Sequence, residues 1–178
     1  MKVLVTGGAG FIGSNLVDRL VNDNHEVIVI DDLSTGNYDY LNEKIKFYKK
    51  DISEGNFDDI FEGVDVVFHL AAKARVQPSI ENPLEFNNVN VTGTLNLLKA
   101  CVDNNVKRFV FSSSSSVYGD VETLPTSEDC TTNPMSPYAL QKLIGEQYCK
   151  LFSELHGLET VCLRYFNVYG ERQLTEGA

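Results

Sequence analysis

Tyr138 and Lys142 are the residues of this sequence whose types and spacing point most directly to chemistry. They stand four residues apart at the start of an expected helix, so they share one of its faces. An unperturbed tyrosine has a pKa of about 10, which makes it a poor base near neutral pH. A neighbouring ammonium group favours the phenolate and lowers that pKa. The pair is a candidate site of proton transfer, although the same spacing is also common on plain helix surfaces.

Serine hydroxyls gather at a second place in the chain. Ser112 to Ser116 form an unbroken run directly after the apolar stretch 106–111, which we expect to be a strand. Open α/β sheets bind their ligands at the carboxyl ends of the strands. We therefore expect the serine run and the Tyr138–Lys142 pair to meet in one cleft.

A glycine-rich turn links the first expected strand, 2–6, to the first helix, in the stretch Thr6-Gly-Gly-Ala-Gly-Phe-Ile-Gly13. Gly7 and Gly10 stand where the backbone must turn sharply and approach a pyrophosphate. At Gly13, in the first helical turn, the missing side chain lets the helix pack closely on the strand. The helix N-terminus offers unpaired N–H groups to phosphates. This pattern predicts a bound dinucleotide.

An acidic residue follows at the distance that a dinucleotide site requires. The apolar run 27–30 predicts a second strand, which ends in Asp31. A carboxylate there accepts a hydrogen bond from a ribose 2′-hydroxyl and repels a 2′-phosphate, so the predicted cofactor is NAD rather than NADP. The polar loop 32–37, which begins with Asp32, is placed to wrap the adenosine half.

Strands and helices alternate along the rest of the chain. Apolar runs predict further strands at 45–48, 64–70, 106–111 and 160–164. Helices are expected at 57–61, 83–104 and 136–156, and the last two begin with Asn82-Pro83 and Ser136-Pro137 as capping pairs. Residues 120–135 are expected to form an irregular loop. The sequence thus predicts an α/β fold, a Rossmann-type doubly wound parallel sheet with helices on both faces.

Composition and charge exclude several classes of function. The 178 residues, 43% hydrophobic and 22% charged, fit one globular domain, and no apolar run is long enough for a membrane span. A formal net charge of -10 argues against sequence-independent binding of nucleic acid. The first residues already form an expected strand, which leaves no room for a signal peptide, so a cytoplasmic location is expected. No metal site is predicted.

Several other residues carry structural expectations. His69 lies in an apolar strand, where a lone histidine is more often a hydrogen-bonded structural residue than a catalytic one. Gly93 costs about 1 kcal/mol against Ala inside a helix, which suggests a close approach by another backbone or by the cofactor. The members of two further sets are expected to serve the core, namely Leu140, Leu143, Ile144 and Leu151, and the cysteines 101, 130, 149 and 162.

Four blocks of the sequence resemble the extended short-chain dehydrogenase/reductases, most closely the UDP-glucose 4-epimerases among them. The blocks are Thr6 to Gly13, Ser112-Ser-Ser-Ser-Ser-Val-Tyr-Gly119, Pro137-Tyr-Ala-Leu-Gln-Lys142 and Leu163-Arg-Tyr-Phe-Asn-Val-Tyr-Gly170. They occur in the order of the family, and the resemblance covers the whole chain.

The resemblance implies roles for individual residues. Tyr138 would be the catalytic base, Lys142 its pKa tuner and a nicotinamide-ribose ligand, and Ser114 the hydroxyl that hydrogen-bonds the reacting sugar oxygen. Asn167 matches a residue that touches the nucleotide sugar. The predicted cofactor contacts are Gly7, Gly10, Phe11, Ile12, Gly13, Asp31, Asp32, Asp51, Ile52, Leu70, Ala71, Ala72, Asn90, Tyr138, Lys142 and Tyr165.

The implied activity is NAD-dependent epimerisation at C4 of a UDP-sugar through transient oxidation to a 4-keto sugar. Family dehydratases carry an acidic residue where Ser115-Ser116 stands here, which favours an epimerase. A non-catalytic NAD-binding module or fragment, or another nucleotide-sugar dehydratase or reductase, stays open as an alternative.

The resemblance also implies how the protein is organised and assembled. Family members are longer, so we expect residues 1–164 to be the NAD-binding domain and 165–178 to begin a segment toward a substrate domain that this chain lacks. The helices 83–104 and 136–156 are those through which the family dimerises, so a homodimer is expected.

Overall fold

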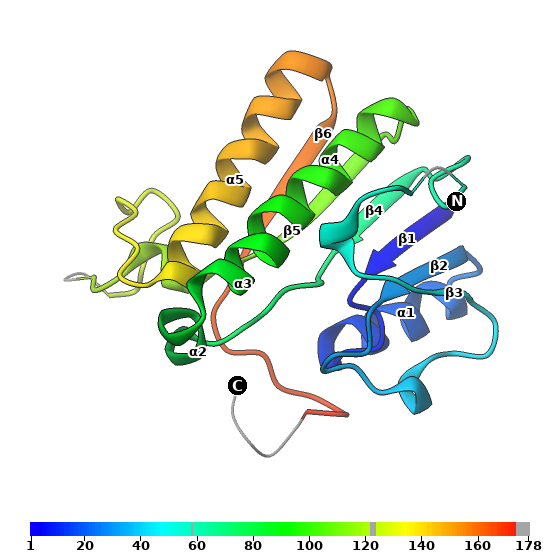
Figure 1. Ribbon diagram of the computed structural model, residues 1–178, viewed down its shortest axis with the longest axis horizontal. Coiled ribbons are helices and arrows are strands. Elements are labelled where there is room, and N and C mark those ends of the chain that lie inside the picture. The colour runs from blue at the N-terminus through cyan, green and yellow to red at the C-terminus, as the bar shows by residue number, and fades with distance from the viewer. Residues whose placement is uncertain (58, 122–123, 174–178) are drawn as a thin grey trace.

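Six parallel strands form one sheet in the computed structural model, which describes residues 1–57, 59–121 and 124–173 (Figure 1). The order across the sheet is β3-β2-β1-β4-β5-β6, so the direction of winding reverses between β1 and β4. Open α/β sheets bind ligands outside the carboxyl ends of the strands at such a reversal. The strands are β1 Lys2–Thr6, β2 Glu26–Asp31, β3 Lys46–Lys49, β4 Val66–His69, β5 Arg108–Ser114 and β6 Glu159–Tyr165.

Helices cover both faces of the sheet, as predicted. Helix α1 (Phe11–Asn22) lies on one face, and α4 (Thr94–Asp103) and α5 (Pro137–His156) lie side by side on the other (Figure 1). The helices α2 Val76–Glu81 and α3 Pro83–Asn87 are shorter. The connections hold the 3-10 helices η1 Tyr38–Tyr40, η2 Ile52–Glu54 and η4 Ser115–Tyr118.

Alternation along the strands divides the apolar core in two. Val3 and Val5 of β1 pack with Val17 of α1, whereas Leu4 between them packs into the cluster that holds Leu97 of α4. Successive strand side chains point to opposite faces, so one apolar run supplies both layers. The near-continuous apolar strands in the sequence follow from this burial on both faces.

The region between β3 and α4 differs most from the prediction. The expected helix 57–61 is wrong in its described residues, where the N–H groups of Ile60 and Phe61 both donate to the carbonyl of Phe57 in a turn. Asp58 lies outside the described residues. The helix expected over 83–104 is divided into α3, a π-helical turn Asn88–Gly93 (η3) and α4, and the short α2 was not expected at all.

Capping is confirmed at one of the two predicted sites. The hydroxyl of Ser136 accepts a hydrogen bond from the N–H of Ala139 at 3.1 Å and begins α5. Asn82 precedes α3 but makes no side-chain capping bond. The loop 120–135 holds no helix or strand among its described residues, which leave out 122 and 123. No helix in the described parts of the chain is long and apolar enough to cross a bilayer.

The prediction that all four cysteines and the α5 leucines serve the core is wrong in part. Cys101 and Cys149 are buried, but Cys130 is half-buried and Cys162 is exposed. Leu140 and Leu151 are 48% and 44% exposed, because they lie on the side of α5 that faces away from the sheet. An exposed apolar stripe therefore runs along this helix.

Candidate active site

Helix α5 presents Tyr138 and Lys142 to the carboxyl end of β5. Lys142 is 5% exposed, and its Nζ donates a hydrogen bond to the carbonyl oxygen of Ser112 at 2.7 Å. The same Nζ lies 5.0 Å from the ring centroid of Phe111. Burial lowers the pKa of Lys142 to about 8, because the buried site disfavours the charged ammonium.

The side chain of Ser114 meets the hydroxyl of Tyr138. Ser114 Oγ accepts hydrogen bonds from the backbone N–H and the hydroxyl of Ser116, at 3.2 Å and 2.9 Å. The hydroxyl proton of Ser114 is thus available for the hydrogen bond that Ser114 makes with Tyr138. Burial raises the pKa of Tyr138, and the hydrogen bond from Ser114 opposes that rise. In the protein alone, Tyr138 is therefore a protonated phenol near neutral pH.

Contacts beneath the pair fix the position of α5. A Cβ on Gly145 would lie 2.4 Å from Cζ of Phe111, so the absent side chain lets the helix approach β5. At the other end, the backbone N–H of Tyr138 donates to the hydroxyl of Ser79 in α2 at 3.1 Å. The unexpected helix α2 thus supports the first turn of α5.

The glycine turn leaves room for a ligand and for close packing. Gly7 has φ +72°, and a Cβ there would lie 2.7 Å from the backbone nitrogen of Ala71. A Cβ on Gly13 would lie 2.1 Å from the carbonyl oxygen of Gly7, so the start of α1 packs directly on the turn. Gly10 precedes α1 and provides no side-chain cap, which leaves the first N–H groups of the helix for another acceptor.

Asp31 lies at the end of β2 beside this turn. Its carboxylate accepts hydrogen bonds from the N–H groups of Ala9 and Leu33, at 3.0 Å and 2.8 Å. Burial raises the pKa of Asp31, and these two bonds oppose the rise. The side chain therefore fastens the glycine turn to β2 while it lines the hollow beside it.

Two hollows run along the carboxyl edge of the sheet and share lining residues at the glycine turn, Gly7 and Gly10, and at Leu70 and Ala72. They form one continuous cleft, whose larger part has a volume of about 800 Å³. Sites for small ligands and cofactors commonly measure about 300–1,000 Å³. Of the predicted site residues, the cleft brings together Gly7, Gly10, Phe11, Ile12, Gly13, Asp31, Asp32, Asp51, Ile52, Leu70, Ala71, Ala72, Ser114, Tyr138, Lys142, Tyr165 and Asn167.

Asn90 is the predicted cofactor residue that does not line the cleft. It is 3% exposed, and its amide exchanges hydrogen bonds with both the N–H and the carbonyl of Lys73, at 2.9 Å and 3.0 Å. A third bond joins it to Gln141 at 2.9 Å. At Gly93 we expected a close approach by another backbone or by the cofactor. The neighbour is instead the side chain of Ile52, whose carbons lie 2.7 Å from the position of an added Cβ.

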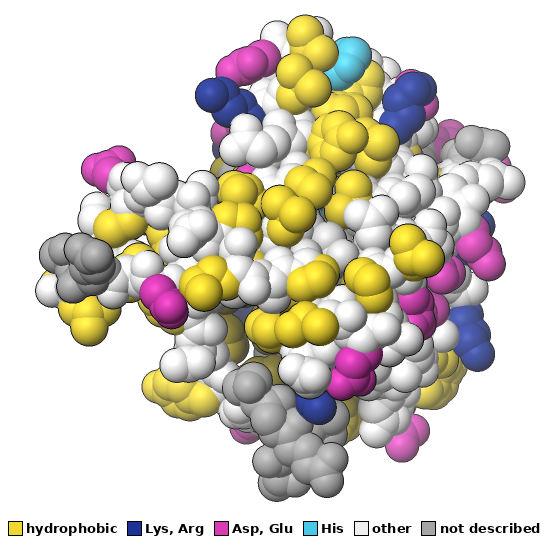
Figure 2. All heavy atoms as spheres, turned by 60° about the vertical axis from the view of Figure 1, so that its left-hand side comes forward, with side chains coloured by type: hydrophobic (Ala, Val, Ile, Leu, Met, Phe, Trp, Pro, Cys, Tyr) yellow, Lys and Arg dark blue, Asp and Glu magenta, His cyan; other side chains and the backbone are white. Residues whose placement is uncertain are grey.

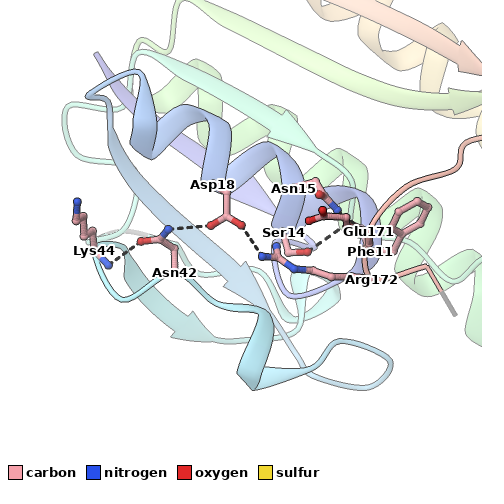
Figure 3. A network of polar contacts seen from close by, with 8 residues as sticks. All are labelled: Phe11, Ser14, Asn15, Asp18, Asn42, Lys44, Glu171 and Arg172. Carbon is pink, nitrogen blue, oxygen red and sulfur yellow. Dashed lines mark hydrogen bonds and ion pairs between the residues drawn. The ribbon is translucent and has the colours of Figure 1, made fainter.

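The segment after β6 is fastened to α1 (Figure 3), and its residues Phe166, Asn167 and Val168 line the cleft. Arg172 donates to the carboxylate of Asp18 at 2.6 Å, and Asn42 donates to its other oxygen at 2.8 Å. Although partial burial raises the pKa of Asp18, these two bonds bring it below its ordinary value. Asn15 donates to the carbonyl of Glu171 at 2.9 Å. These contacts hold the strand-end residues 165–168 over the start of α1.

Sequence reasoning missed three basic residues of the cleft, Lys50, Lys73 and Arg75. All three follow strand ends, Lys50 after β3 and the other two after β4. Their position just past parallel strands was a usable signal, since such ends meet at one edge. Arg75 also has φ +86°, in the left-handed region that non-glycine residues rarely adopt.

The geometry unites a glycine turn suited to a pyrophosphate, an acidic strand end and a Ser-Tyr-Lys cluster. The sequence matches the NAD dependent epimerase/dehydratase family over residues 3–177. The chain belongs to this family. NAD is the cofactor of the family. The cleft fits it, because the start of α1 has no side-chain cap at Gly10 and the carboxylate of Asp31 lines the same hollow.

Individual family members are similar along nearly the whole chain. A putative UDP-glucose 4-epimerase of Methanocaldococcus jannaschii is 46% identical over 98% of the chain, and the UDP-glucose 4-epimerase of Lactobacillus helveticus is 42% identical over 96%. The chain spans about half the length of these relatives, 58% and 52% respectively.

Solved structures of family members share the fold. A UDP-N-acetylglucosamine 4-epimerase from Methanobrevibacter ruminantium in complex with UDP-N-acetylmuramic acid matches with a TM-score of 0.94 at 45% identity. The Thermus thermophilus UDP-glucose 4-epimerase complex with NAD matches with 0.93 at 39% identity. Each comparison covers 99% of this chain and 58% of the other.

Proposed function

We propose that this protein binds NAD in the cleft and serves the epimerisation of a UDP-sugar at C4. The observation that carries the proposal is that Ser114, Tyr138 and Lys142 line one part of a cleft that continues past the glycine turn to Asp31. The similarity to epimerases that act on UDP-glucose supports the substrate class. The assignment of the individual site residues remains part of this proposal.

The proposed mechanism assigns one task to each side chain. NAD held by the glycine turn would supply reversible hydride acceptance at C4 of the sugar. The Oη of Tyr138 would accept the proton of the sugar 4-hydroxyl. The hydroxyl of Ser114, turned from Tyr138 toward the sugar, would donate a hydrogen bond to the same sugar oxygen. The ammonium of Lys142 stabilises the phenolate of Tyr138. Tyr138 would return its proton to the 4-oxygen when C4 is reduced from the opposite face of the sugar, which gives the C4 epimer.

The alternatives differ in what they require of the cleft. Elimination of water by a dehydratase requires an acid, whereas Ser115 and Ser116 follow Ser114 here. A non-catalytic NAD-binding module requires only the glycine turn and Asp31. The division into an NAD-binding domain 1–164 and a leading segment 165–178 also remains a prediction, and 174–178 lie outside the described residues.

We further propose a homodimer through the outer side of α5. Figure 2, which brings forward the part of the molecule that holds α5, shows apolar side chains spread across this face. Leu140, Leu151 and Leu155 are 48%, 44% and 67% exposed at helical spacing, and Leu84 of α3 is 86% exposed. Exposed apolar surface of this kind often marks a protein interface. A cytoplasmic location remains a prediction.

Turnover tests the proposed function. The purified protein with NAD is expected to convert UDP-galactose to UDP-glucose, and Tyr138→Phe is expected to lower kcat at least about 100-fold with NAD still bound. Tyr148→Phe on the same helix is the matched control, because Tyr148 packs against the core and does not line the cleft. NAD binding without turnover in the wild type would favour the non-catalytic module instead.

A further inference from the structure

Three buried polar side chains form a row beneath the cleft. Thr6 at the end of β1, His69 at the end of β4 and Thr94 at the start of α4 are each at most 1% exposed. The hydroxyl of Thr6 lies 2.7 Å from Nδ1 of His69, and the hydroxyl of Thr94 lies 2.9 Å from its Nε2. We call this row the His69 bridge. It connects the two strands at the reversal of the sheet to the helix that covers them.

The partners of the two hydroxyls determine the direction of every hydrogen bond in the bridge. Thr94 donates its single hydroxyl proton to the carbonyl of Asn90 at 2.6 Å, so it must accept a proton from Nε2 of His69. Nδ1 of the neutral ring is then an acceptor, and Thr6 donates to it. The imidazole therefore carries its proton on Nε2. Thr6 is the donor to Nδ1, and Thr94 is the acceptor from Nε2–H.

Each end of the bridge holds one end of the loop that follows β4. On one side, the carbonyl and the hydroxyl of Thr6 accept hydrogen bonds from the N–H groups of Leu70 and Ala71, at 3.1 Å and 3.2 Å. On the other side, the amide of Asn90 holds both backbone groups of Lys73. The loop 70–73 lines the cleft directly beside the glycine turn, where a Cβ on Gly7 would lie 2.7 Å from the backbone nitrogen of Ala71.

The surroundings of His69 keep the ring neutral. The rings of Phe109 and Phe111 lie 5.7 Å and 5.6 Å from it. Burial and, to a smaller degree, the charge of Lys142 lower the pKa of His69 to about 3. His69 does not line the cleft, so it acts on a ligand only through its neighbours.

We propose that His69, as the Nε2–H tautomer, is a positioning residue that joins the two supports of the loop 70–73 and thereby fixes the wall against which the cofactor binds. The cofactor part of this inference rests on the proposed function. The support of the loop does not, because it follows from contacts within the protein.

Thr94→Val and Thr94→Ser form a matched pair of variants for the test. Valine keeps the shape but leaves Nε2–H of His69 without its acceptor and removes the hydroxyl bond to the carbonyl of Asn90, whereas serine keeps the hydroxyl. Thr160→Val is the control, since it also removes a hydroxyl bond to a helix carbonyl, from Thr160 to Cys149 at 3.2 Å, far from this loop in the fold. Amide hydrogen exchange, NAD affinity and the ¹⁵N spectrum of the His69 ring are measured on the full chain.

The expected results separate positioning from plain stabilisation. In Thr94→Val, the amides of Ala71 and Lys73 should exchange about tenfold faster and NAD should bind about tenfold more weakly, as the loss of a buried hydrogen-bond partner implies. Thr94→Ser should stay near the wild type in both. Thr160→Val should lower the melting temperature without either effect. The wild-type ¹⁵N spectrum should show protonated Nε2 and bare Nδ1 from pH 5 to 9.

Two results would overturn the inference. One is a His69 ring protonated on Nδ1, and the other is unchanged exchange at Ala71 and Lys73 in Thr94→Val. If the wild type binds no NAD, the proposed function fails, whereas the exchange and ¹⁵N measurements still decide the role of the bridge.

Discussion

The Nζ of Lys142 lies 5.9 Å from the ring centroid of Tyr138 and gives a hydrogen bond to the carbonyl of Ser112 instead. The ammonium is thus fixed on β5, one helical turn below the tyrosine. Ser114, not Lys142, makes the hydrogen bond to the phenol. In the proposed mechanism, Lys142 therefore acts on Tyr138 through its charge, whereas Ser114 orients the substrate oxygen.

Lys142→Met should weaken catalysis by raising the pKa of Tyr138. Loss of the nearby positive charge disfavours the phenolate, so the acid limb of the kcat/KM profile should move to higher pH. At pH 7 the rate should fall about 10- to 100-fold and recover in part at pH 9. The profile is measured for C4 epimerisation of UDP-galactose. An acid limb at the wild-type pH would contradict the assigned role.

Gly13→Ala should disrupt the glycine turn, and Gly10→Ala should be much milder. The added Cβ would lie 2.1 Å from the carbonyl oxygen of Gly7 in the first variant but 3.3 Å from it in the second. We expect Gly13→Ala to destabilise the fold by about 3 kcal/mol or more and Gly10→Ala by about 1 kcal/mol. Urea unfolding followed by circular dichroism measures both. Equal losses would show that the turn relaxes around the new methyl group.

Glu146→Gln should destabilise the fold through an unpaired arginine. Glu146 lies one turn after Lys142 and binds the guanidinium of Arg164 through both oxygens, at 2.9 Å and 2.7 Å, and it also accepts from Ser113. Its side chain is 9% exposed and that of Arg164 is 25% exposed. Removal of one partner of a largely buried pair should cost about 2–4 kcal/mol.

The control for Glu146 lies on the same helix. Glu154 pairs with Lys150 at 3.9 Å, and its side chain is 60% exposed. Glu154→Gln should change the unfolding free energy by less than about 0.5 kcal/mol. A similar loss in both variants would mean that the buried pair adds nothing beyond an exposed one.

Acidification should destabilise the protein through His69. Its pKa is about 3 in the fold against the ordinary 6.5, so between these values the unfolded chain binds one more proton at this site. The unfolding free energy should therefore fall as pH drops below about 6.5, by up to about 1.4 kcal/mol per pH unit. Urea unfolding of the wild type and His69→Phe from pH 7 to 4 measures this, since the variant lacks the titration. Equal slopes would contradict the prediction.

The fold and the main site followed from the sequence because local signals and the parallel topology agree. The glycine turn, Asp31 and the α5 pair each sit at a strand end or helix start, and parallel strands bring all such ends to one edge. The order of strands and helices along the sequence was therefore enough to predict that Tyr138 lies near Ser114.

Other features depend on contacts that no local pattern encodes. Within the π turn Asn88–Gly93, the missing side chain of Gly93 leaves space for Ile52, and the amide of Asn90 holds Lys73 of the loop 70–73. The exposure of Leu140 and Leu151 depends on which side of α5 faces the sheet. Periodicity predicts an apolar face but not whether that face meets the core or another protein.

The nucleotide that the purified protein carries or binds tests most directly whether the cleft is an NAD site. The protein is denatured, released nucleotides are identified by mass spectrometry, and the nucleotide-free protein is titrated calorimetrically with NAD and NADP. We predict one NAD per chain, released or rebound, and at least about tenfold weaker binding of NADP because Asp31 repels a 2′-phosphate. Absence of any released nucleotide together with no heat of NAD binding by the folded protein would contradict the account.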